Sequence, residues 1–340
     1  MSQLIEDIHA QPTALRRLAA DIGTHDGWRA LAALGHARPP LLLGMGASYH
    51  AALVAERQLW HYGIAAQALE AADVVLYGQL QPQQPVVFVS QSGESAEVAP
   101  LLARLPADTP LIAVTNTPDS TLARHAQIVL PVQAGPGEML VATRTYVNSL
   151  AALWLLGRIW GGAQDGSEQD ALERTAAAMD ALLAEAKPIT TQWLDTLEAA
   201  RTLVFLGHGP HAATARHAAM MMTEWVKQPT LGTSIGAFRH GVIEIVQPDV
   251  GVVIFTAPSA GHRSALALAD ELVGYGAQVL LVNGGTTGTV AEPPASSLAL
   301  DEFLAPLLAV VPAQLFVDAL QKHRGGPAQF RYISKVTTRL

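Results

Sequence analysis

Three serines and a glycine crowd into one short segment of the N-terminal half, Ser90-Gln91-Ser92-Gly93-Glu94-Ser95. The segment follows an apolar strand pattern and precedes a helical one, and open α/β sheets bind ligands at such strand ends. Hydroxyl groups, main-chain amides and a helix N-terminus together favour a phosphate group. A helix N-cap with ordinary turn serines uses the same residue types. The spacing therefore indicates either a phosphate-binding loop or a plain capped turn.

A second segment, Gly44-Met45-Gly46-Ala47-Ser48, also joins a strand pattern to a helical pattern. Its Ser48 could face the same anion. Tyr49 occupies the place of the third glycine in a dinucleotide-binding fingerprint, which argues against such a cofactor. The chain also has no Walker loop, so the sequence does not support an ATPase.

Two residues of the C-terminal half, Glu224 and His240, could transfer protons. A carboxyl group in apolar surroundings has a raised pKa and suits a general base. A histidine titrates near neutrality and can donate or accept a proton. Taken alone, each residue is more often a surface glutamate or a structural histidine.

The elements that must position these residues alternate between short apolar strands and longer helices, which is typical of a parallel α/β sheet. We expect strands at Pro40–Gly44, Pro85–Ser90, Leu111–Thr115 and Gln127–Pro131, with a weaker one at Ala66–Glu70. Helices are expected at Ser48–Tyr62, Val98–Leu105, Arg144–Trp160, Glu168–Ala186, Thr190–Ala200 and Phe303–Lys322.

The second half of the chain repeats this plan. Gly44-Met45-Gly46 is echoed by Gly207-His208-Gly209, Val86–Ser90 by Val252–Thr256, and Leu111–Asn116 by Gln278–Asn283. The offsets are nearly constant, at 207−44=163, 256−90=166 and 283−116=167. We therefore predict two similar lobes produced by an internal duplication.

Composition narrows the class of protein. Of 340 residues, 50% are hydrophobic and 15% charged, and the formal net charge of −8 argues against nucleic-acid binding. No apolar run is long enough to span a membrane, and the first residues do not resemble a signal peptide, so we expect a cytoplasmic protein. There is no cysteine. His208, His211 and His217 have no carboxylate or cysteine at ligand spacing, so we expect no metal and no cofactor.

The residues Gly44–Ala52 and Ser90–Ser95 resemble the two signatures of the sugar isomerase (SIS) family. From Ile5 to its last residues, the chain is similar to the isomerase half of glucosamine-6-phosphate synthase and its stand-alone relatives. The resemblance implies two SIS lobes, each a flavodoxin-like three-layer αβα sandwich with a parallel sheet. The first, residues 1–162, would carry the phosphate site, and the second, residues 168–340, the acid–base residues and the C-terminal tail.

The resemblance also assigns expected roles to individual residues. Glu224 and His240 lie 240−224=16 residues apart, as in the family, and His240 would come from the neighbouring subunit of a homodimer. The tail Ser334-Lys335-Val336-Thr337 resembles the family's terminal segment, whose lysine reaches the reactive end of the sugar. The expected site is therefore catalytic Glu224, His240 and Lys335; phosphate-binding Ser48, Ser90, Gln91, Ser92 and Ser95; and sugar-lining Gly46, Ala47, Thr143 and Arg239.

Three departures from the family pattern bear on the activity. Met221 replaces a lysine one turn before the glutamate, Ala237 replaces a glutamate, and Val242 replaces a proline. The expected function is a phosphosugar isomerase or an amino-sugar-phosphate deaminase acting on a hexose or hexosamine 6-phosphate. A fructosamine-type phosphate deglycase and a non-catalytic phosphosugar sensor are the alternatives. Without a cysteine, glutamine-dependent amidotransfer is not expected. The second lobe has Thr256-Ala257-Pro258-Ser259-Ala260 in place of the serine loop, so we predict one phosphate site per chain.

Overall fold

The computed structural model describes residues 2–35, 38–136, 141–291, 301–325 and 330–332, and its contacts divide the chain into two compact units. One unit contains Ala10–Ala176 together with Arg331 and Tyr332. The other contains residues 2–9 and the described residues of Ala177–Phe330. This division falls within helix α9 (Glu168–Ala184). The expected domains, residues 1–162 and 168–340, stay a prediction.

The sheet of the 10–176 unit has five parallel strands in the order β2-β1-β3-β4-β5. Strands β1, β3 and β4 are buried along their whole length, as expected where helices cover both faces. The strands lie within a residue of the predicted ranges: β1 (Leu41–Gly44), β2 (Gln67–Glu70), β3 (Val86–Val89), β4 (Leu111–Thr115) and β5 (Ile128–Pro131).

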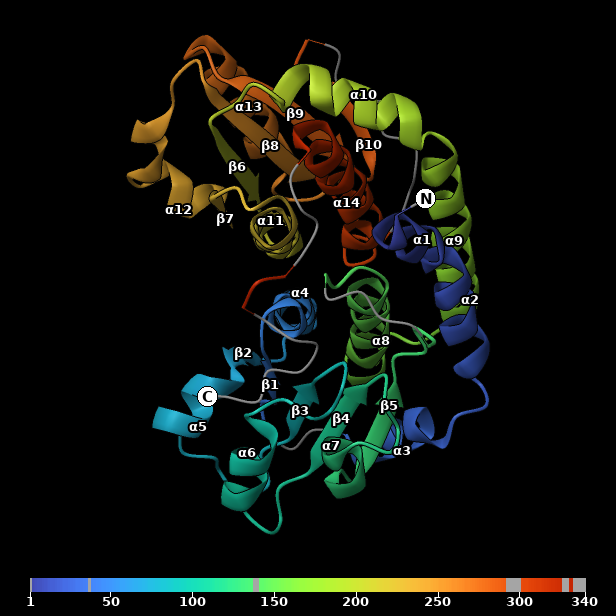
Figure 1. Cartoon of the computed structure of the whole chain (residues 1–340). Helices are drawn as coiled ribbons and strands as arrows, with labels where there is room; N and C mark the ends of the chain where they lie inside the picture. The colour runs from blue at the N-terminus through green and yellow to red at the C-terminus, as the bar shows by residue number, and fades with distance from the viewer. Residues whose placement is uncertain (1, 36–37, 137–140, 292–300, 326–329, 333–340) are drawn as a thin grey trace. The chain divides into compact units, whose positions relative to one another are not determined.

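Helices cover both faces of this sheet (Figure 1). Apolar residues of α5, α6 and α7 pack on β1, β3 and β4 in one buried cluster. Helices α4 and α8 pack against each other and against strands of the same sheet. The helices of this unit are α2 (Gln11–Asp21), α3 (Asp26–Leu34), α4 (Ala47–His61), α5 (Ala71–Tyr77), α6 (Val98–Arg104), α7 (Thr121–His125), α8 (Arg144–Trp160) and the first part of α9.

The sheet of the 177–330 unit has the order β10-β9-β8-β6-β7. Four of its strands are parallel, and β10 pairs with β9 in the antiparallel sense after a turn at Gly284-Gly285. The sequence did not predict this antiparallel edge strand. The strands are β6 (Thr202–Gly207), β7 (Thr230–Ser234), β8 (Val250–Thr256), β9 (Gln278–Asn283) and β10 (Thr286–Thr289).

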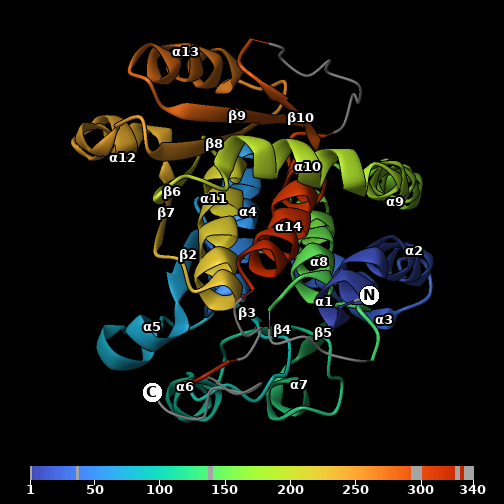
Figure 2. The same cartoon turned by 45° about the horizontal axis from the view of Figure 1, so that its top comes forward.

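Helices α10, α11 and α14 pack together beside this sheet, and α13 covers the other side of β8 and β9 (Figure 2). The long helix α14 is buried along most of its length, so it forms much of the core. The helices of this unit are α1 (Gln3–His9), α10 (Ala186–Leu197), α11 (Pro210–Met221), the π-helix η1 (Met222–Val226), α12 (Ile235–Arg239), the 3₁₀-helix η2 (Val242–Ile245), α13 (His262–Gly274) and α14 (Ala305–Arg324).

The two sheets repeat one another strand by strand. The order β2-β1-β3-β4-β5 corresponds to β7-β6-β8-β9-β10, with β1 matching β6, β3 matching β8 and β4 matching β9. These are the three pairs of segments that the constant sequence offset linked. The predicted fold class, two tandem αβα sandwiches with parallel sheets, is confirmed, and β10 is the one strand that runs the other way.

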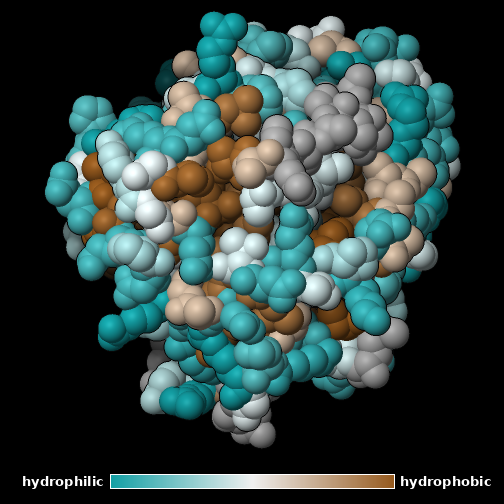
Figure 3. Space-filling model, turned by 90° about the horizontal axis from the view of Figure 1, so that it is seen from above, coloured by the Kyte–Doolittle hydropathy of each residue, from teal (hydrophilic) through white to brown (hydrophobic). Residues whose placement is uncertain are grey.

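Most of the face drawn in Figure 3 is hydrophilic, and apolar side chains reach it in separate patches. Among the described residues, the large apolar side chains that stay exposed include Leu76, Tyr77, Val273 and Tyr275. In the part of the chain that the structure describes, no helix is long and apolar enough to cross a membrane.

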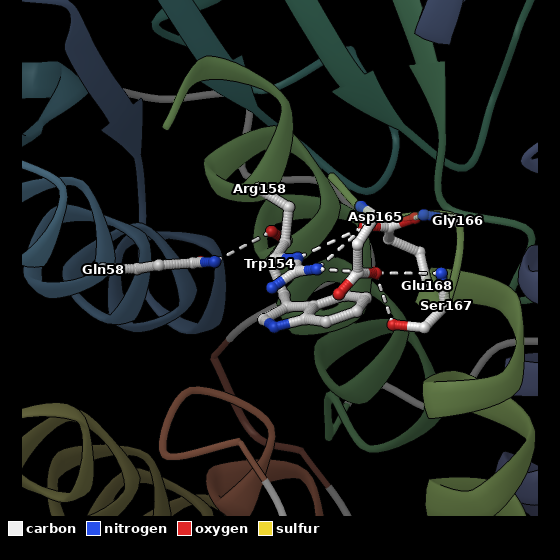
Figure 4. A network of polar contacts seen from close by, with 7 residues as sticks. All are labelled: Gln58, Trp154, Arg158, Asp165, Gly166, Ser167 and Glu168. Atoms are coloured by element: carbon white, nitrogen blue, oxygen red, sulfur yellow. Dashed lines mark hydrogen bonds and ion pairs between the residues drawn. The ribbon is translucent and has the colours of Figure 1, made fainter. Parts of the chain in front are cut away.

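An ion-pair network closes the end of α8 onto the start of α9 (Figure 4). The Arg158 guanidinium donates to Glu168 Oε1 at 3.0 Å and lies 5.8 Å from the Trp154 ring centroid. The main-chain amides of Asp165 and Gly166 donate to the Glu168 carboxylate, each at 3.2 Å. This carboxylate therefore holds both the arginine and the turn that connects the two helices.

Candidate functional site

The serine loop lies directly after β3 and uses its hydroxyl oxygens to shape itself. Ser90 Oγ accepts a hydrogen bond from the Gly93 amide at 3.1 Å, and Ser92 Oγ accepts one from the Glu94 amide at 3.2 Å. A hydroxyl that accepts in this way keeps its own hydrogen for donation. Ser95 Oγ is buried and has no hydrogen-bond partner in the described chain. The loop thus offers hydroxyl donors of the kind that an oxyanion accepts.

Contacts with α7 hold the loop in its conformation. Gly93 has φ +65°, and a Cβ there would lie 2.1 Å from Ser120 Oγ, so only glycine fits. The Leu122 amide donates to the Gly93 carbonyl at 3.1 Å. The Glu94 carboxylate accepts a hydrogen bond from the Thr121 amide, and this bond lowers the pKa of Glu94. These contacts fix the loop independently of any ligand.

The end of β4 supports the loop from the other side. The Gln91 carbonyl accepts hydrogen bonds from the Asn116 amide at 3.2 Å and from Thr115 Oγ1 at 3.2 Å. Asn116 also bridges to the segment that follows β5, because its side chain donates to the Gly135 carbonyl at 3.1 Å and accepts from the Ala134 amide at 2.8 Å. The role of the Gln91 side chain in phosphate binding stays a prediction.

Ser48 lies in the first turn of α4, which follows β1. Gly46 precedes the helix with φ +52°, and a Cβ on Gly44 would lie 2.7 Å from the Ser48 backbone. Strands β1 and β3 are hydrogen-bonded neighbours with Leu43 opposite Phe88. Their carboxyl ends, and with them Gly46, Ala47, Ser48 and the serine loop, therefore emerge at the same edge of one sheet.

Two further residues, Thr143 and Lys335, were also predicted to lie at the site. Thr143 is buried just before α8, and its carbonyl accepts from the Val147 amide at 3.0 Å. Lys335 lies outside the described residues.

A cavity of about 530 Å³ lies at the carboxyl ends of β4 and β5, and its described lining includes Thr115, Asn116 and Gln133 but none of the predicted serines.

Glu224 lies on the π-helix η1, in the other unit. A π-turn carries one extra residue per turn and is frequent at functional sites. Burial raises the pKa of Glu224 to about 7, against an opposing effect of the nearby Lys227 charge. Its Oε2 atom is buried and has no hydrogen-bond partner among the described residues. A carboxyl group that titrates near neutrality and is not committed to another contact suits a general base.

His240 and Arg239 lie at the end of α12 and are exposed. The Arg239 guanidinium pairs with the Glu271 carboxylate of α13 at 2.7 Å, which lowers the pKa of Glu271. In the described chain, His240 and Glu224 do not hydrogen-bond to each other. Helix α12 instead contacts β6, β7 and η2. The roles of His240 and Arg239 stay predictions.

Comparison with known families identifies the unit that carries the serine loop. The model of the SIS domain matches residues 34–158. This part of the chain is a SIS domain. The match spans β1 to β5 and contains both Ser48 and the whole serine loop.

Proteins similar to this chain span both units. The glutamine–fructose-6-phosphate aminotransferase (isomerizing) of Methanothermobacter thermautotrophicus is 26% identical over 342 residues, covering 98% of this chain and 57% of that protein. The chain thus spans little more than half the length of that relative.

Solved structures share the fold along nearly the whole chain. The C-terminal domain of the Francisella tularensis glucosamine-fructose-6-phosphate aminotransferase has a TM-score of 0.84 at 18% identity, covering 96% of this chain and 97% of that one. Thermotoga maritima glucosamine-6-phosphate deaminase has a TM-score of 0.79 at 21% identity, covering 99% of both chains. At these identities the likeness shows that the fold is shared.

The second unit of the chain has different side chains at the positions equivalent to the predicted phosphate loops. Thr256 Oγ1 lies 3.0 Å from His262 Nδ1, and His208 Nε2 lies 3.1 Å from Ser264 Oγ. His211, which corresponds to Ser48, is fully buried, and burial lowers its pKa to about 4. Within the described residues, no three histidine or acidic side chains are grouped to hold a metal ion.

Sequence reasoning missed the π-turn and Lys227. The π-turn has only five residues and ends the helix, so no helical segment follows it in which a shifted apolar periodicity could be seen. Pro229, two residues after Lys227, does indicate that the helix ends nearby.

Proposed function

We propose that this protein is a phosphosugar aldose–ketose isomerase or an amino-sugar-phosphate deaminase that acts on a hexose or hexosamine 6-phosphate. The serine loop would bind the 6-phosphate, with Ser48 as a further donor. Glu224 would transfer the proton, and His240 and Lys335 would assist at the ring oxygen and at the reactive end of the sugar. The substrate would react in its open-chain form.

One observation carries the phosphate assignment. The oxygens of Ser90 and Ser92 already accept main-chain hydrogen bonds, so their hydroxyl hydrogens remain available for donation to an acceptor. Hydrogen bonds to a charged phosphate contribute about 1.5–3 kcal/mol each. An ordinary capped turn needs only one such hydroxyl, whereas this loop has two fixed in this way and a third, Ser95, without a partner.

The chemistry of the proposal follows from the state of Glu224. Its carboxylate would remove the proton from C2 of the open-chain aldose, the electron pair would form the C1–C2 double bond, and the C1 oxygen would take up a proton to give an enediol. The proton on Glu224 would exchange with solvent, and its delivery to C1, with loss of the proton from the C2 hydroxyl, gives the ketose. With an amino group at C2, the same transfer gives a ketimine, and addition of one water then releases ammonia and the ketose phosphate. A pKa of about 7 leaves both forms of Glu224 populated at neutral pH.

Proton exchange tests this function directly. The wild-type protein is incubated in deuterated water with a panel of hexose and hexosamine 6-phosphates, and NMR follows deuterium entering C1 or C2 and any release of ammonia. We expect exchange with at least one sugar, and a loss of at least 100-fold in Glu224→Gln, since general-base catalysis contributes about 10²–10⁴-fold.

Two comparisons separate catalysis from binding alone. Phosphosugars should raise the melting temperature of wild type and of Glu224→Gln, and this rise should disappear in Ser90→Ala/Ser92→Ala. Stabilisation without exchange anywhere on the panel would instead identify a phosphosugar sensor. A fructosamine 6-phosphate that loses its amine would identify a deglycase. The absence of any stabilisation by phosphosugars would contradict the proposal as a whole.

A further inference from the structure

Lys227 has a backbone conformation that is unusual for its residue type. It follows the π-helix directly and has φ +64° and ψ +26°, in the left-handed region. Glycine adopts this conformation freely, whereas another residue there costs on the order of 1 kcal/mol. Lysine therefore occupies a position where the backbone conformation would be more favourable for glycine or asparagine. This points to a role for its side chain.

The ammonium group of Lys227 is directed back onto the turn that carries Glu224. Lys227 Nζ donates to the main-chain carbonyl of Glu224. The same ammonium lies 4.9 Å from the ring centroid of Phe330, and that ring packs against Trp225 at 6.1 Å. All of these residues belong to one unit. The cation is thus held between the π-turn and an aromatic side chain.

The position one turn before Glu224 supplies no charge. Met221 is fully buried at the end of α11, and its thioether cannot act as a cation. Lys227 lies one turn after Glu224, on the opposite side along the chain. Its positive charge favours the ionised carboxylate, whereas burial favours the neutral acid.

Other titratable groups lie on the elements packed against η1, which are α11 and α14. His217 of α11 is buried, and Asp318 of α14 pairs with Lys322 and with the Ser2 hydroxyl. Arg324 donates to Gln228 Oε1 at 2.6 Å. Among the described residues, Lys227 is the charged group that acts on Glu224.

We propose that Lys227 is a positioning residue for Glu224, which fixes the π-turn through the Glu224 carbonyl and keeps the carboxyl group ionisable in its buried setting. The inference rests on the proposed role of Glu224 as the base. It assigns to a residue three positions after the glutamate the cation that Met221 cannot provide.

The test compares Lys227→Asn, which tolerates the left-handed backbone without a charge, with Lys227→Arg, which keeps the charge. The Glu224 pKa is measured by NMR on protein with ¹³C-labelled glutamate carboxyls, with the signal assigned by its absence in Glu224→Gln. We expect a higher Glu224 pKa in Lys227→Asn and a value near wild type in Lys227→Arg. Lys322→Met, which removes another lysine near η1, should leave the Glu224 pKa unchanged.

The pH profile of isotope exchange provides the second readout. A rise of about half a pKa unit lowers the ionised fraction about threefold well below the pKa and hardly at all above it. Exchange by Lys227→Asn should therefore fall about threefold at pH 6 and stay near wild type at pH 9.

The two proposals fail in different ways. An unchanged Glu224 pKa in Lys227→Asn overturns the positioning role, whatever the activity. A shifted pKa in a protein that exchanges no proton with any sugar supports the positioning role and overturns the proposed function.

Discussion

At the scale of single residues, burial of the Glu224 carboxyl links stability to pH. The pKa is raised from 4.5 to about 7 on folding. Between these values the unfolded chain ionises while the folded chain stays largely protonated, so wild-type stability falls as pH rises through this window and levels off above it. Glu224→Gln has no such titration. Between pH 5 and pH 8, the free energy of unfolding of Glu224→Gln should therefore rise relative to that of wild type by on the order of 2 kcal/mol. Its melting temperature should rise relative to wild type over the same range.

Glu94→Gln is the control that should show no trend between pH 5 and pH 8. A hydrogen bond from Thr121 lowers the pKa of exposed Glu94 from 4.5, so its contribution is fully present above that pH and is lost only in stronger acid. Scanning calorimetry at pH 5, 6, 7 and 8 follows both variants. If the difference between Glu224→Gln and wild type is the same at every pH, Glu224 is not a titrating buried carboxyl.

Residue types drew attention to the serine loop, and the family resemblance drew attention to Glu224, but neither showed the surroundings of these residues. The hydroxyls and Gly93 are visible in the sequence because strand-loop-helix patterns place them. The partnerless state of Ser95 and the raised pKa of Glu224 depend on burial by segments far along the chain. The left-handed Lys227 had no sequence signal, since lysine is rare in that conformation.

At the scale of elements, the junction between α8 and α9 depends on Glu168. The expected domain boundary falls at this junction, yet Glu168 is buried and accepts hydrogen bonds from Arg158 and two main-chain amides. Removal of the Glu168 side chain takes away the buried partner of Arg158 and the acceptor of two main-chain amides, while Asp165 still contacts the guanidinium. Unsatisfied buried polar groups of this kind cost about 1–3 kcal/mol. We expect Glu168→Ala to lower the free energy of unfolding by that order in urea denaturation.

Asp165 supplies the matched control for Glu168→Ala. It contacts the same guanidinium at 3.1 Å, but its side chain is 63% exposed, and surface ion pairs contribute little. The Ser167 hydroxyl, rather than the arginine, is the main cause that lowers the pKa of Asp165 to about 2. Asp165→Ala should therefore change stability far less than Glu168→Ala. Equal losses in the two variants would show that Glu168 holds no special place in the network.

Boundaries of elements were predictable where apolar runs are bounded by proline and glycine, as for β1, β3 and β4. The antiparallel β10 was not, because Thr286–Thr289 has a weak apolar pattern and its pairing depends on the turn at Gly284-Gly285. The division of α9 between two units was also hidden, since a continuous helical pattern does not show which neighbours each half contacts.

At the scale of the whole molecule, the internal duplication was predictable because duplicated strands keep a constant spacing. The two copies share the fold but differ in the side chains at the predicted phosphate-binding positions. His211 replaces the residue equivalent to Ser48, and Pro258 interrupts the loop equivalent to the serine loop. One unit is thereby suited to bind an anion, whereas the other carries the candidate acid–base residues.

Exposed apolar side chains near His240 bear on the proposed homodimer. Ile245 of η2 is 37% exposed, and Val273 and Tyr275 at the end of α13 are 48% and 56% exposed. The Tyr275 hydroxyl interacts electrostatically with Glu244 on η2, so the end of α13 and η2 lie close together. Apolar side chains left on a surface favour contact with another protein. A second copy of this chain, contributing its own His240, is the partner that the resemblance implies.

Mixing two inactive variants tests whether His240 acts in the neighbouring subunit. Glu224→Gln and His240→Ala carry different tags and are co-expressed, and the mixed dimer is purified through both tags. If His240 completes the partner's site, one site of the mixed dimer carries both changes and the other carries neither. Isotope exchange should then return to about half the wild-type rate, because one of two sites is intact. If His240 acts within its own chain, both sites are damaged and exchange stays at the level of the parents. Glu224→Gln paired with itself controls for the tags, and recovery in that sample would invalidate the comparison.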